Sequence, residues 1–241
     1  MIIHERASPN HDARPEGGRV DMLVLHYTGM KTAAEAIDRL CDPAARVSAH
    51  YVIDEDGTVW RLVEESRRAW HAGVSFWQGT ENLNAASIGI ELVNPGHEWG
   101  YRAFPQAQMV SLETLCRGLL RRHPIPADRV VGHSDVAPLR KQDPGELFDW
   151  ERLARAGTGL WPSAGAAAPA GIAEEQAMLA TIGYSVPNSG SLDDETRQVL
   201  VAFQRHFRPR ALDGRLDDEA GARLAAVARA VAALRAGRSP S

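Results

Sequence analysis

The chain has 241 residues, with 27 lysines and arginines against 31 aspartates and glutamates, so its net charge is −4. Hydrophobic residues make up 44% of the sequence, which is enough for a sizeable core in one large domain or two smaller ones. The balanced charge without basic runs argues against nucleic-acid binding, and no stretch approaches the roughly 20 apolar residues that a membrane-spanning helix needs.

The first predicted elements alternate between strand and helix. Residues 22–28 form a continuous apolar run, which is typical of a strand buried on both faces. Apolar residues at helical spacing predict a helix over 32–41. A hairpin is expected next, with strands at 49–53 and 58–63 joined by a turn at 54–57.

The segments that follow complete an α/β pattern. Residues 87–93 are apolar and predict another strand, which ends at the turn sequence Asn94-Pro95-Gly96. Residues 105–123 begin at a proline and have the pattern of a long amphipathic helix. Val130-Val131 predicts a short strand that leads into His133. We therefore expect a mixed central β-sheet flanked by helices.

The composition changes near residue 157. Residues 157–173 are rich in Gly, Ala, Pro and Ser, as in a linker, and only helical patterns follow them. Asp193 and Asp217 each follow a leucine in a weak internal repeat and are well placed as helix N-caps. We predict a first domain over 1–160, a linker over 161–173 and a small three-helix domain over 174–237.

Two histidines and an aspartate form a candidate metal site. His26 lies in the first apolar strand, and His133 precedes Asp143 by ten residues in a stretch where prolines prevent a regular helix. Two imidazoles and one carboxylate suit zinc, and three protein ligands leave one coordination position for water, as in hydrolytic sites. Cys41 and Cys116 match no metal-binding spacing, and we expect both to be reduced and buried.

Glu91 and Lys141 are the candidates for catalysis beside this metal. Glu91 lies in an apolar strand, where desolvation raises the pKa of a carboxyl toward the range of a general acid–base group. Lys141 is one of only two lysines in the chain and precedes Asp143 by two residues, so its ammonium is placed to stabilise an oxyanion. Together with the metal, these groups predict amide hydrolysis.

Each of these residues also has an ordinary structural explanation. His26 fits a hydrogen-bonded core histidine, Asp143 fits a turn residue before a proline, and Lys141 fits a solvated surface charge. Glu91 is harder to explain in this way, because a charge in an apolar strand needs a partner or a function. The residues alone leave both a metal hydrolase and a purely structural set of polar groups open.

Several ordered blocks lie within about residues 20–152: Leu25-His26-Tyr27-Thr28, Ser48-Ala49-His50-Tyr51-Val52-Ile53, Ala69-Trp70-His71-Ala72-Gly73, Ser87-Ile88-Gly89-Ile90-Glu91, and Gly132-His133-Ser134-Asp135-Val136-Ala137-Pro138 through Lys141-Gln142-Asp143-Pro144-Gly145. This succession resembles the type-2 N-acetylmuramoyl-L-alanine amidases, which are zinc enzymes related to phage amidase lysozymes and animal peptidoglycan-recognition proteins. The resemblance implies that the chain cleaves the amide between the lactyl group of N-acetylmuramic acid and the L-alanine of the stem peptide.

The resemblance also implies a role for each candidate residue. The implied ligands of one zinc ion per chain are His26, His133 and Asp143, and the implied catalytic residues are Glu91 and Lys141. Three further residues are candidates for substrate binding, namely Arg140, Asn94 and His71. Their alternatives are a surface ion pair for Arg140, a turn for Asn94, and a place in the wall or around the metal ligands for His71.

The carboxy-terminal region resembles a small helical peptidoglycan-binding domain. The resemblance runs through residues 179–184, 193–196 and 202–209. The alternative is a fused helical bundle that stabilises or shields the first domain. The partners implied by both regions are muropeptide or peptidoglycan fragments.

The expected function is a zinc-dependent amidase for soluble muropeptides, including 1,6-anhydro species, in cell-wall recycling. The amino terminus lacks the features of a secretory signal, which favours a cytoplasmic location. An exported, periplasmic amidase for intact peptidoglycan is the first alternative, and the carboxy-terminal resemblance favours it. A noncatalytic muropeptide sensor is the second, although all ligand and catalytic positions are filled.

Overall fold

A computed structural model describes residues 1–165 and 168–237 of the chain. The strands are β1 (Ile3–Glu5), β2 (His11–Ala13), β3 (Met22–Tyr27), β4 (Tyr51–Ile53), β5 (Val59–Arg61), β6 (Arg67–Ala69), β7 (Phe76–Trp77), β8 (Thr80–Glu81), β9 (Ser87–Leu92) and β10 (Val130–Gly132). The helices are α1 (Ala33–Cys41), α2 (Gly96–Trp99), α3 (Gln106–Arg122), α4 (His133–Val136), α5 (Trp150–Arg155), α6 (Ile172–Ile182), α7 (Asp194–Phe207) and α8 (Asp218–Ala236).

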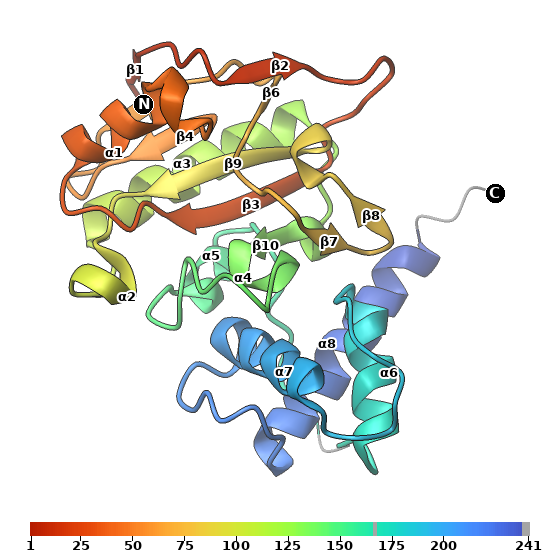
Figure 1. Cartoon of the computed structure of the whole chain (residues 1–241). Coiled ribbons are helices and arrows are strands. Elements are labelled where there is room, and N and C mark those ends of the chain that lie inside the picture. Colours follow the sequence, from red (N-terminus) through yellow and green to blue (C-terminus); the bar gives the residue numbers. More distant parts are fainter. Residues whose placement is uncertain (166–167, 238–241) are drawn as a thin grey trace.

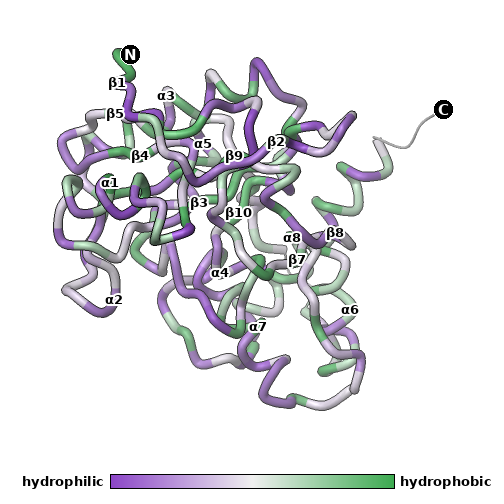
Figure 2. Tube along the Cα trace, turned by 45° about the horizontal axis from the view of Figure 1, so that its top comes forward, coloured by the Kyte–Doolittle hydropathy of each residue, from purple (hydrophilic) through white to green (hydrophobic). Residues whose placement is uncertain are grey.

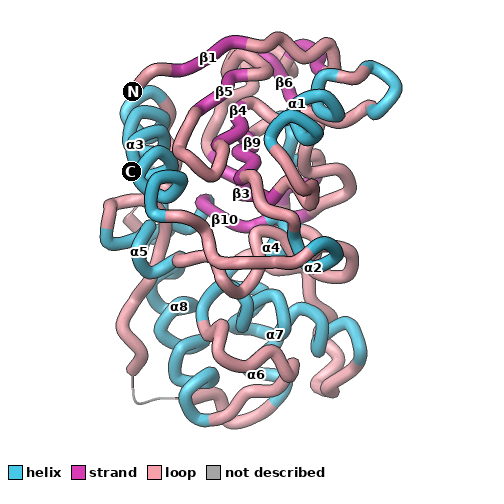
Figure 3. The backbone as a smooth tube through the Cα atoms, turned by 90° about the vertical axis from the view of Figure 1, so that its left-hand side faces the viewer, coloured by secondary structure: helices cyan, strands magenta, loops and turns pink. Residues whose placement is uncertain are grey.

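The largest sheet has six strands in the order β1-β5-β4-β9-β3-β10. Its centre is parallel, because β3 pairs in parallel with both β9 and β10, and β4 pairs in parallel with β9. The hairpin of β4 and β5 adds an antiparallel pair. The sheet is therefore mixed, and helices flank it on both faces (Figures 1 and 3), which confirms the predicted α/β class.

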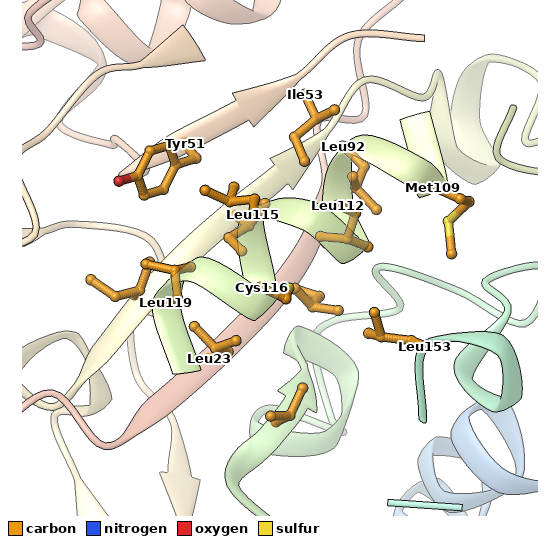
Figure 4. Close-up of a cluster of buried hydrophobic side chains, with 14 of the residues drawn as sticks. Leu23, Tyr51, Ile53, Leu92, Met109, Leu112, Leu115, Cys116, Leu119 and Leu153 are labelled. Carbon is orange, nitrogen blue, oxygen red and sulfur yellow. The ribbon is translucent and has the colours of Figure 1, made fainter. Parts of the chain in front are cut away.

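One face of the sheet packs on the long helix α3. Side chains alternate between the two faces of a strand, so Leu23 and Leu25 of β3 share this face with Ile88 and Ile90 of β9. Figure 4 shows Leu112, Leu115 and Leu119 of α3 among the labelled side chains of this cluster. Figure 2 shows hydrophobic segments in the middle of the molecule and more hydrophilic ones in many outer loops.

The same alternation turns the polar residues of the central strands to the opposite face. His26 and Glu91 are Cα partners in the β3–β9 pair, and both alternate with the leucines and isoleucines that face α3. Helix α1 covers another part of this face, where Ile37 and Leu40 pack with Val52 of β4. The second face therefore carries both packing residues and the candidate site.

The carboxy-terminal helices complete the cover of this second face. Met22 and Val24 of β3 and Val131 of β10 belong to one buried cluster with Phe203 of α7 and Val227 of α8. Figure 1 shows α6, α7 and α8 grouped below α4 and β10. The helical region therefore shares its hydrophobic core with the sheet.

Two aromatic residues mark this shared core. The ring of Trp77, in β7, packs edge-on against Tyr184 at a centroid distance of 4.9 Å. The backbone N–H of Gln78 donates to the carbonyl of Gly183, and the side-chain amide of Gln78 donates to the carbonyl of Ile182. Apolar packing and hydrogen bonds thus join the two regions.

Several sequence predictions are confirmed element by element. The run over 22–28 is β3, the helix over 105–123 is α3, and the hairpin is β4 and β5. Asp193 and Asp217 cap α7 and α8, where their side chains accept the N–H groups of Thr196 and Ala220. The strand β1, the small sheets β2–β6 and β7–β8, and the short helices α2, α4 and α5 were not predicted.

The other predictions have mixed outcomes. Both cysteines are free and Cys116 is buried, but Cys41 is partly exposed, so its predicted burial was wrong. The predicted linker includes residues 166–167, which lie outside the described residues, and α6 begins at Ile172, two residues before the predicted helical domain. The domain boundaries stay a prediction. Among the described residues, no helix combines the length and apolar character needed to cross a membrane.

We predict that the sheet and the carboxy-terminal helices unfold together. Trp77→Ala empties a buried position between them and should lower the free energy of unfolding by about 3–5 kcal/mol. Denaturation followed by circular dichroism and by hydrogen exchange in α7 and β3 should show one coincident transition. Separate transitions, with only one region destabilised, would contradict the shared core.

Candidate functional site

The candidate site forms where the central parallel strands end. His26 and Glu91 lie side by side near the carboxyl ends of β3 and β9. Gly132 of β10 pairs with Leu25, so His133, the next residue, lies level with His26 and opens α4. Crevices at the carboxyl ends of parallel strands are common ligand sites in α/β sheets.

Asp143 joins the two histidines from the loop after α4. Its carbonyl accepts the backbone N–H of Ser134 at 2.8 Å, which ties the loop to the start of α4. Its Oδ2 lies 3.0 Å from Nδ1 of His26 and 3.0 Å from Nδ1 of His133, and the two Nδ1 atoms are 2.9 Å apart. The three atoms form a nearly equilateral triangle, and all three residues are buried.

The neighbours of the histidines leave this triangle without hydrogen atoms. Nε2 of His133 lies 3.1 Å from the carbonyl of Ala72, which can only accept, so this nitrogen carries the proton and Nδ1 carries a lone pair. Nε2 of His26 contacts Nδ1 of His71 at 3.1 Å, and its own Nδ1 faces the triangle. Lone pairs at this separation repel one another unless a cation lies between them.

The charge states suit a cation. Burial lowers the pKa of His26 to about 4, and the nearby His133 acts in the same direction, so the imidazole is neutral at pH 7. Burial alone would raise the pKa of Asp143, but the adjoining His133 and His26 rings outweigh it and hold the pKa below its usual range. Neutral imidazoles and an ionised carboxylate are the forms that bind a metal.

The donor set and spacing fit a small divalent ion. Ligand bonds of about 2.0–2.2 Å in a tetrahedral site place neighbouring donor atoms about 3.3 Å apart, close to the edges of this triangle. Two nitrogens and one carboxylate oxygen are a common zinc donor set. His26, His133 and Asp143 thus have the geometry of a metal site, and the charge states of His26 and Asp143 suit one.

Glu91 presents an unpaired carboxyl beside the triangle. Its Oε2 is buried and has no hydrogen-bond partner. Burial raises the pKa of Glu91 well above its ordinary value, the charge of Asp143 raises it further, and the charge of Lys141 lowers it. A carboxyl with a raised pKa holds a proton more readily, so it can both accept one and return it.

The five candidate metal and catalytic residues line one cleft. The cavity has a volume of about 370 Å³ and is also bordered by Thr28, Met30 and Trp70. His26, Glu91, His133, Lys141 and Asp143 all contribute to its wall. The structure therefore brings together, from β3, β9, the first residue of α4 and the loop after it, all of the residues to which the sequence assigned metal binding and catalysis.

The three predicted substrate-binding residues are placed differently. Arg140 lines the cleft, but its guanidinium donates to the carbonyls of Ala72 and Val74, so it holds the neighbouring loop. His71 also borders the cleft, with both ring nitrogens in contact with protein groups. Arg140 thus bonds backbone carbonyls and not the surface ion partner that was its alternative, and His71 lies in the wall beside the candidate ligand His26, as its alternative had it.

Asn94 is not among the residues that line this cleft. Its side chain is fully buried, its amide N–H donates to the carbonyl of Arg102, and its Oδ1 accepts the N–H of Gly96. These bonds close the turn after β9. The alternative that Asn94 makes the turn describes its contacts.

The sequence did not predict that residues of the carboxy-terminal region hydrogen-bond to α4, the short helix that begins at His133. Asp135 of α4 accepts the N–H of Gly132, the hydroxyl of Tyr184 at 2.6 Å and Nδ1 of His206 at 2.7 Å. The ring of His206 stacks on Trp150 at a centroid distance of 3.7 Å. The only sequence signal was the position of Asp135 two residues after His133, which says nothing of partners 49 and 71 residues away.

Comparison with known proteins agrees with this geometry. Residues 16–146 match the family model of the N-acetylmuramoyl-L-alanine amidases, and residues 169–224 match a model of a peptidoglycan binding domain. The chain is 38% identical over 223 residues to the N-acetylmuramoyl-L-alanine amidase AmiD of Escherichia coli, covering 83% of this chain and 79% of that protein.

A further relative and a solved structure show how much of the chain is shared. The 1,6-anhydro-N-acetylmuramyl-L-alanine amidase AmpD of Haemophilus influenzae is 37% identical over 163 residues, which are 60% of this chain and 86% of that protein. The solved complex of Escherichia coli AmiD with anhydro-N-acetylmuramic acid-L-Ala-D-γ-Glu-L-Lys superposes with a TM-score of 0.78 at 36% identity, covering 90% and 91% of the two chains.

We predict that Asn94→Ala weakens the fold and leaves substrate affinity unchanged. The change strands the N–H of Gly96 and the carbonyl of Arg102, at a cost of about 1–3 kcal/mol in the free energy of unfolding. Urea denaturation measures this loss, and KM of the folded variant should stay within about twofold of wild type. A tenfold rise in KM at full stability would restore the substrate-binding role.

Proposed function

The chain belongs to the N-acetylmuramoyl-L-alanine amidase family, and we propose that it is a zinc-dependent member that hydrolyses soluble anhydro-muropeptides in cell-wall recycling. The bond cleaved joins the lactyl group of muramic acid to the L-alanine of the stem peptide. The observation that carries the proposal is the triangle of three buried acceptor atoms beside the unpaired carboxyl of Glu91.

Zinc as the metal is supported by the donor atoms. His26, His133 and Asp143 supply a nitrogen, nitrogen and oxygen set, and no cysteine lies among them. When bound, zinc supplies Lewis-acid chemistry that polarises a carbonyl and activates water at neutral pH. With three protein ligands the site is an open one, which is typical of zinc in hydrolases.

The residues of the chain supply the proton transfers and the charge. Glu91 takes a proton from the attacking water and returns it to the departing amine of L-alanine, for which its raised pKa is suited. Lys141 lines the same cleft, and in this proposal its ammonium stabilises the amide oxygen as that oxygen becomes negative. Burial of both His26 and Asp143 strengthens these electrostatic effects by excluding water.

Anhydro-muropeptides are supported as substrates by the relatives. One named relative is a 1,6-anhydro-N-acetylmuramyl-L-alanine amidase, and the solved relative was bound to an anhydro-N-acetylmuramic acid peptide. The proposed place of action is the cytoplasm, where such fragments are recycled. A second candidate function, cleavage of intact peptidoglycan outside the cytoplasm, is favoured by the match of residues 169–224 to a peptidoglycan binding domain.

The substrate proposal is tested by digesting two materials side by side. The zinc-loaded full chain is incubated with purified anhydro-muropeptides and with intact sacculi, and products are identified by mass spectrometry. We expect free stem peptide from the fragments at least about tenfold faster per bond than from sacculi. Faster release from sacculi would support the second candidate function.

Glu91→Gln provides the matched control for chemistry. The amide has the size of the carboxyl but cannot move a proton, so kcat should fall by about 100-fold or more. Zinc content and KM should remain near the wild-type values, because Glu91 is not a metal ligand in this proposal. A noncatalytic sensor would show no turnover in either protein, only binding of fragments.

Asp143→Asn tests the metal site without an activity assay. Loss of the negative ligand should weaken zinc binding by more than the roughly 10- to 100-fold typical of changes around a metal site. In the metal-free protein the new amide can donate to a neighbouring Nδ1 lone pair, so thermal stability should be equal to wild type or higher. Unchanged zinc affinity, measured by chelator competition, would refute the assignment.

A further inference from the structure

His71 lies between a candidate metal ligand and a strand serine. Its Nδ1 is 3.1 Å from Nε2 of His26, and its Nε2 is 3.1 Å from Oγ of Ser87. Oγ of Ser87 in turn lies 2.6 Å from the carbonyl of Leu83. All three side chains are buried, so bulk water does not compete for these contacts.

The carbonyl of Leu83 ends this series of contacts and sets the direction of every hydrogen bond in the series. Because a carbonyl only accepts, the hydroxyl of Ser87 must donate to Leu83, and its oxygen is left to accept. The Nε2–H of His71 therefore donates to Ser87, which leaves a lone pair on Nδ1 of His71. That lone pair requires the proton of His26 to be on Nε2 and leaves Nδ1 of His26 free for a metal.

We propose that Ser87 and His71 are positioning residues that hold His26 in the one tautomer able to bind the metal through Nδ1. Ligand histidines commonly donate their second nitrogen to a carboxylate or a carbonyl, which fixes the tautomer. His133 follows this pattern with the carbonyl of Ala72. At His26 the acceptor is the neutral imidazole of His71. Nδ1 of His71 can accept only while the proton of that ring is on Nε2, and the contacts with Ser87 and Leu83 hold the proton there.

The strands are built to hold this ring. A methyl group at Gly89 of β9 would overlap the His71 ring, so the glycine provides the space that the imidazole occupies. Asn84 Oδ1 accepts the backbone N–H groups of His71 and Ala72, which fixes the loop carrying the ring. The same loop presents the carbonyl that orients His133.

Without Ser87 a competing arrangement becomes available. His71 can then place its proton on Nδ1 and donate to His26, whose own proton moves to Nδ1 and bonds Oδ2 of Asp143. The metal must displace that proton before it binds. The inference rests on the proposed zinc site, because it concerns the readiness of His26 to act as a ligand.

The first test is Ser87→Ala in the full chain, with Ser111→Ala as the matched control. Ser111 also donates to a carbonyl at 2.6 Å, that of Gly57, but it lies on α3 on the other side of the sheet. Chelator competition should show the zinc dissociation constant raised about 10- to 100-fold in Ser87→Ala. The Ser111→Ala variant should bind zinc like wild type.

A second pair of variants separates hydrogen bonding from packing. His71→Asn and His71→Leu introduce side chains of similar size, and only Asn offers an acceptor to Nε2 of His26. We expect His71→Leu to weaken zinc binding by the same 10- to 100-fold range, and His71→Asn to recover most of the loss. Equal losses in both variants would show that the ring acts only by filling space.

Nitrogen NMR of labelled histidines reads the tautomer directly in the metal-free proteins. Wild type and Ser111→Ala should carry the His26 proton on Nε2, and Ser87→Ala should carry a substantial fraction on Nδ1. Wild-type zinc affinity and an unchanged tautomer in Ser87→Ala would overturn the proposed positioning role. Failure of the wild type itself to bind zinc would instead overturn the proposed function, so the two failures are distinguishable.

Discussion

The site depends on three buried acceptor atoms that face one another with no hydrogen to share. Nδ1 of His26, Nδ1 of His133 and Oδ2 of Asp143 lie 2.9–3.0 Å apart. Such an arrangement is costly for the chain alone, because desolvated lone pairs repel. It persists because β3, β10 and the loop after α4 are fixed by the sheet and by its packing. A cation would convert the same arrangement from repulsive to attractive, so the rigidity of the fold and the proposed affinity for a metal have one structural origin.

Much of this could be predicted, because the relevant rules are local. Strand side chains alternate, so the polar positions of 22–28 and 87–93 had to share a face opposite the leucines and isoleucines. The apolar runs therefore predicted both strands, and the polar residues within them, His26 and Glu91, stood out as candidates for the site. His133 and Asp143 were found through their spacing and through the family resemblance. The cap residues Asp193 and Asp217 were predictable for the same reason, since capping is decided within four residues.

What could not be predicted involves partners that no local pattern connects. Ser87 and His71 are 16 residues apart, and the sequence gives no indication that one orients the other. Arg140 and Asn94 have polar side chains suited to substrate, but backbone carbonyls and a turn use those groups instead. The contact of Tyr184 and His206 with Asp135 depends on how the helices pack against the sheet. Tertiary packing determines these side-chain contacts, and neither composition nor local sequence pattern predicts it.

The union of the carboxy-terminal helices with the sheet limits how they can serve as an anchor. A binding module on a flexible linker lets a catalytic domain reach many substrate bonds around one attachment point. Here the buried cluster that joins Met22 and Val24 to Phe203 and Val227 prevents the helices from moving independently of the cleft. Any glycan or peptide held by these helices would meet the cleft at one fixed distance and angle. Processing an extended polymer would then require release and rebinding at every cut, whereas a small diffusing fragment imposes no such cycle.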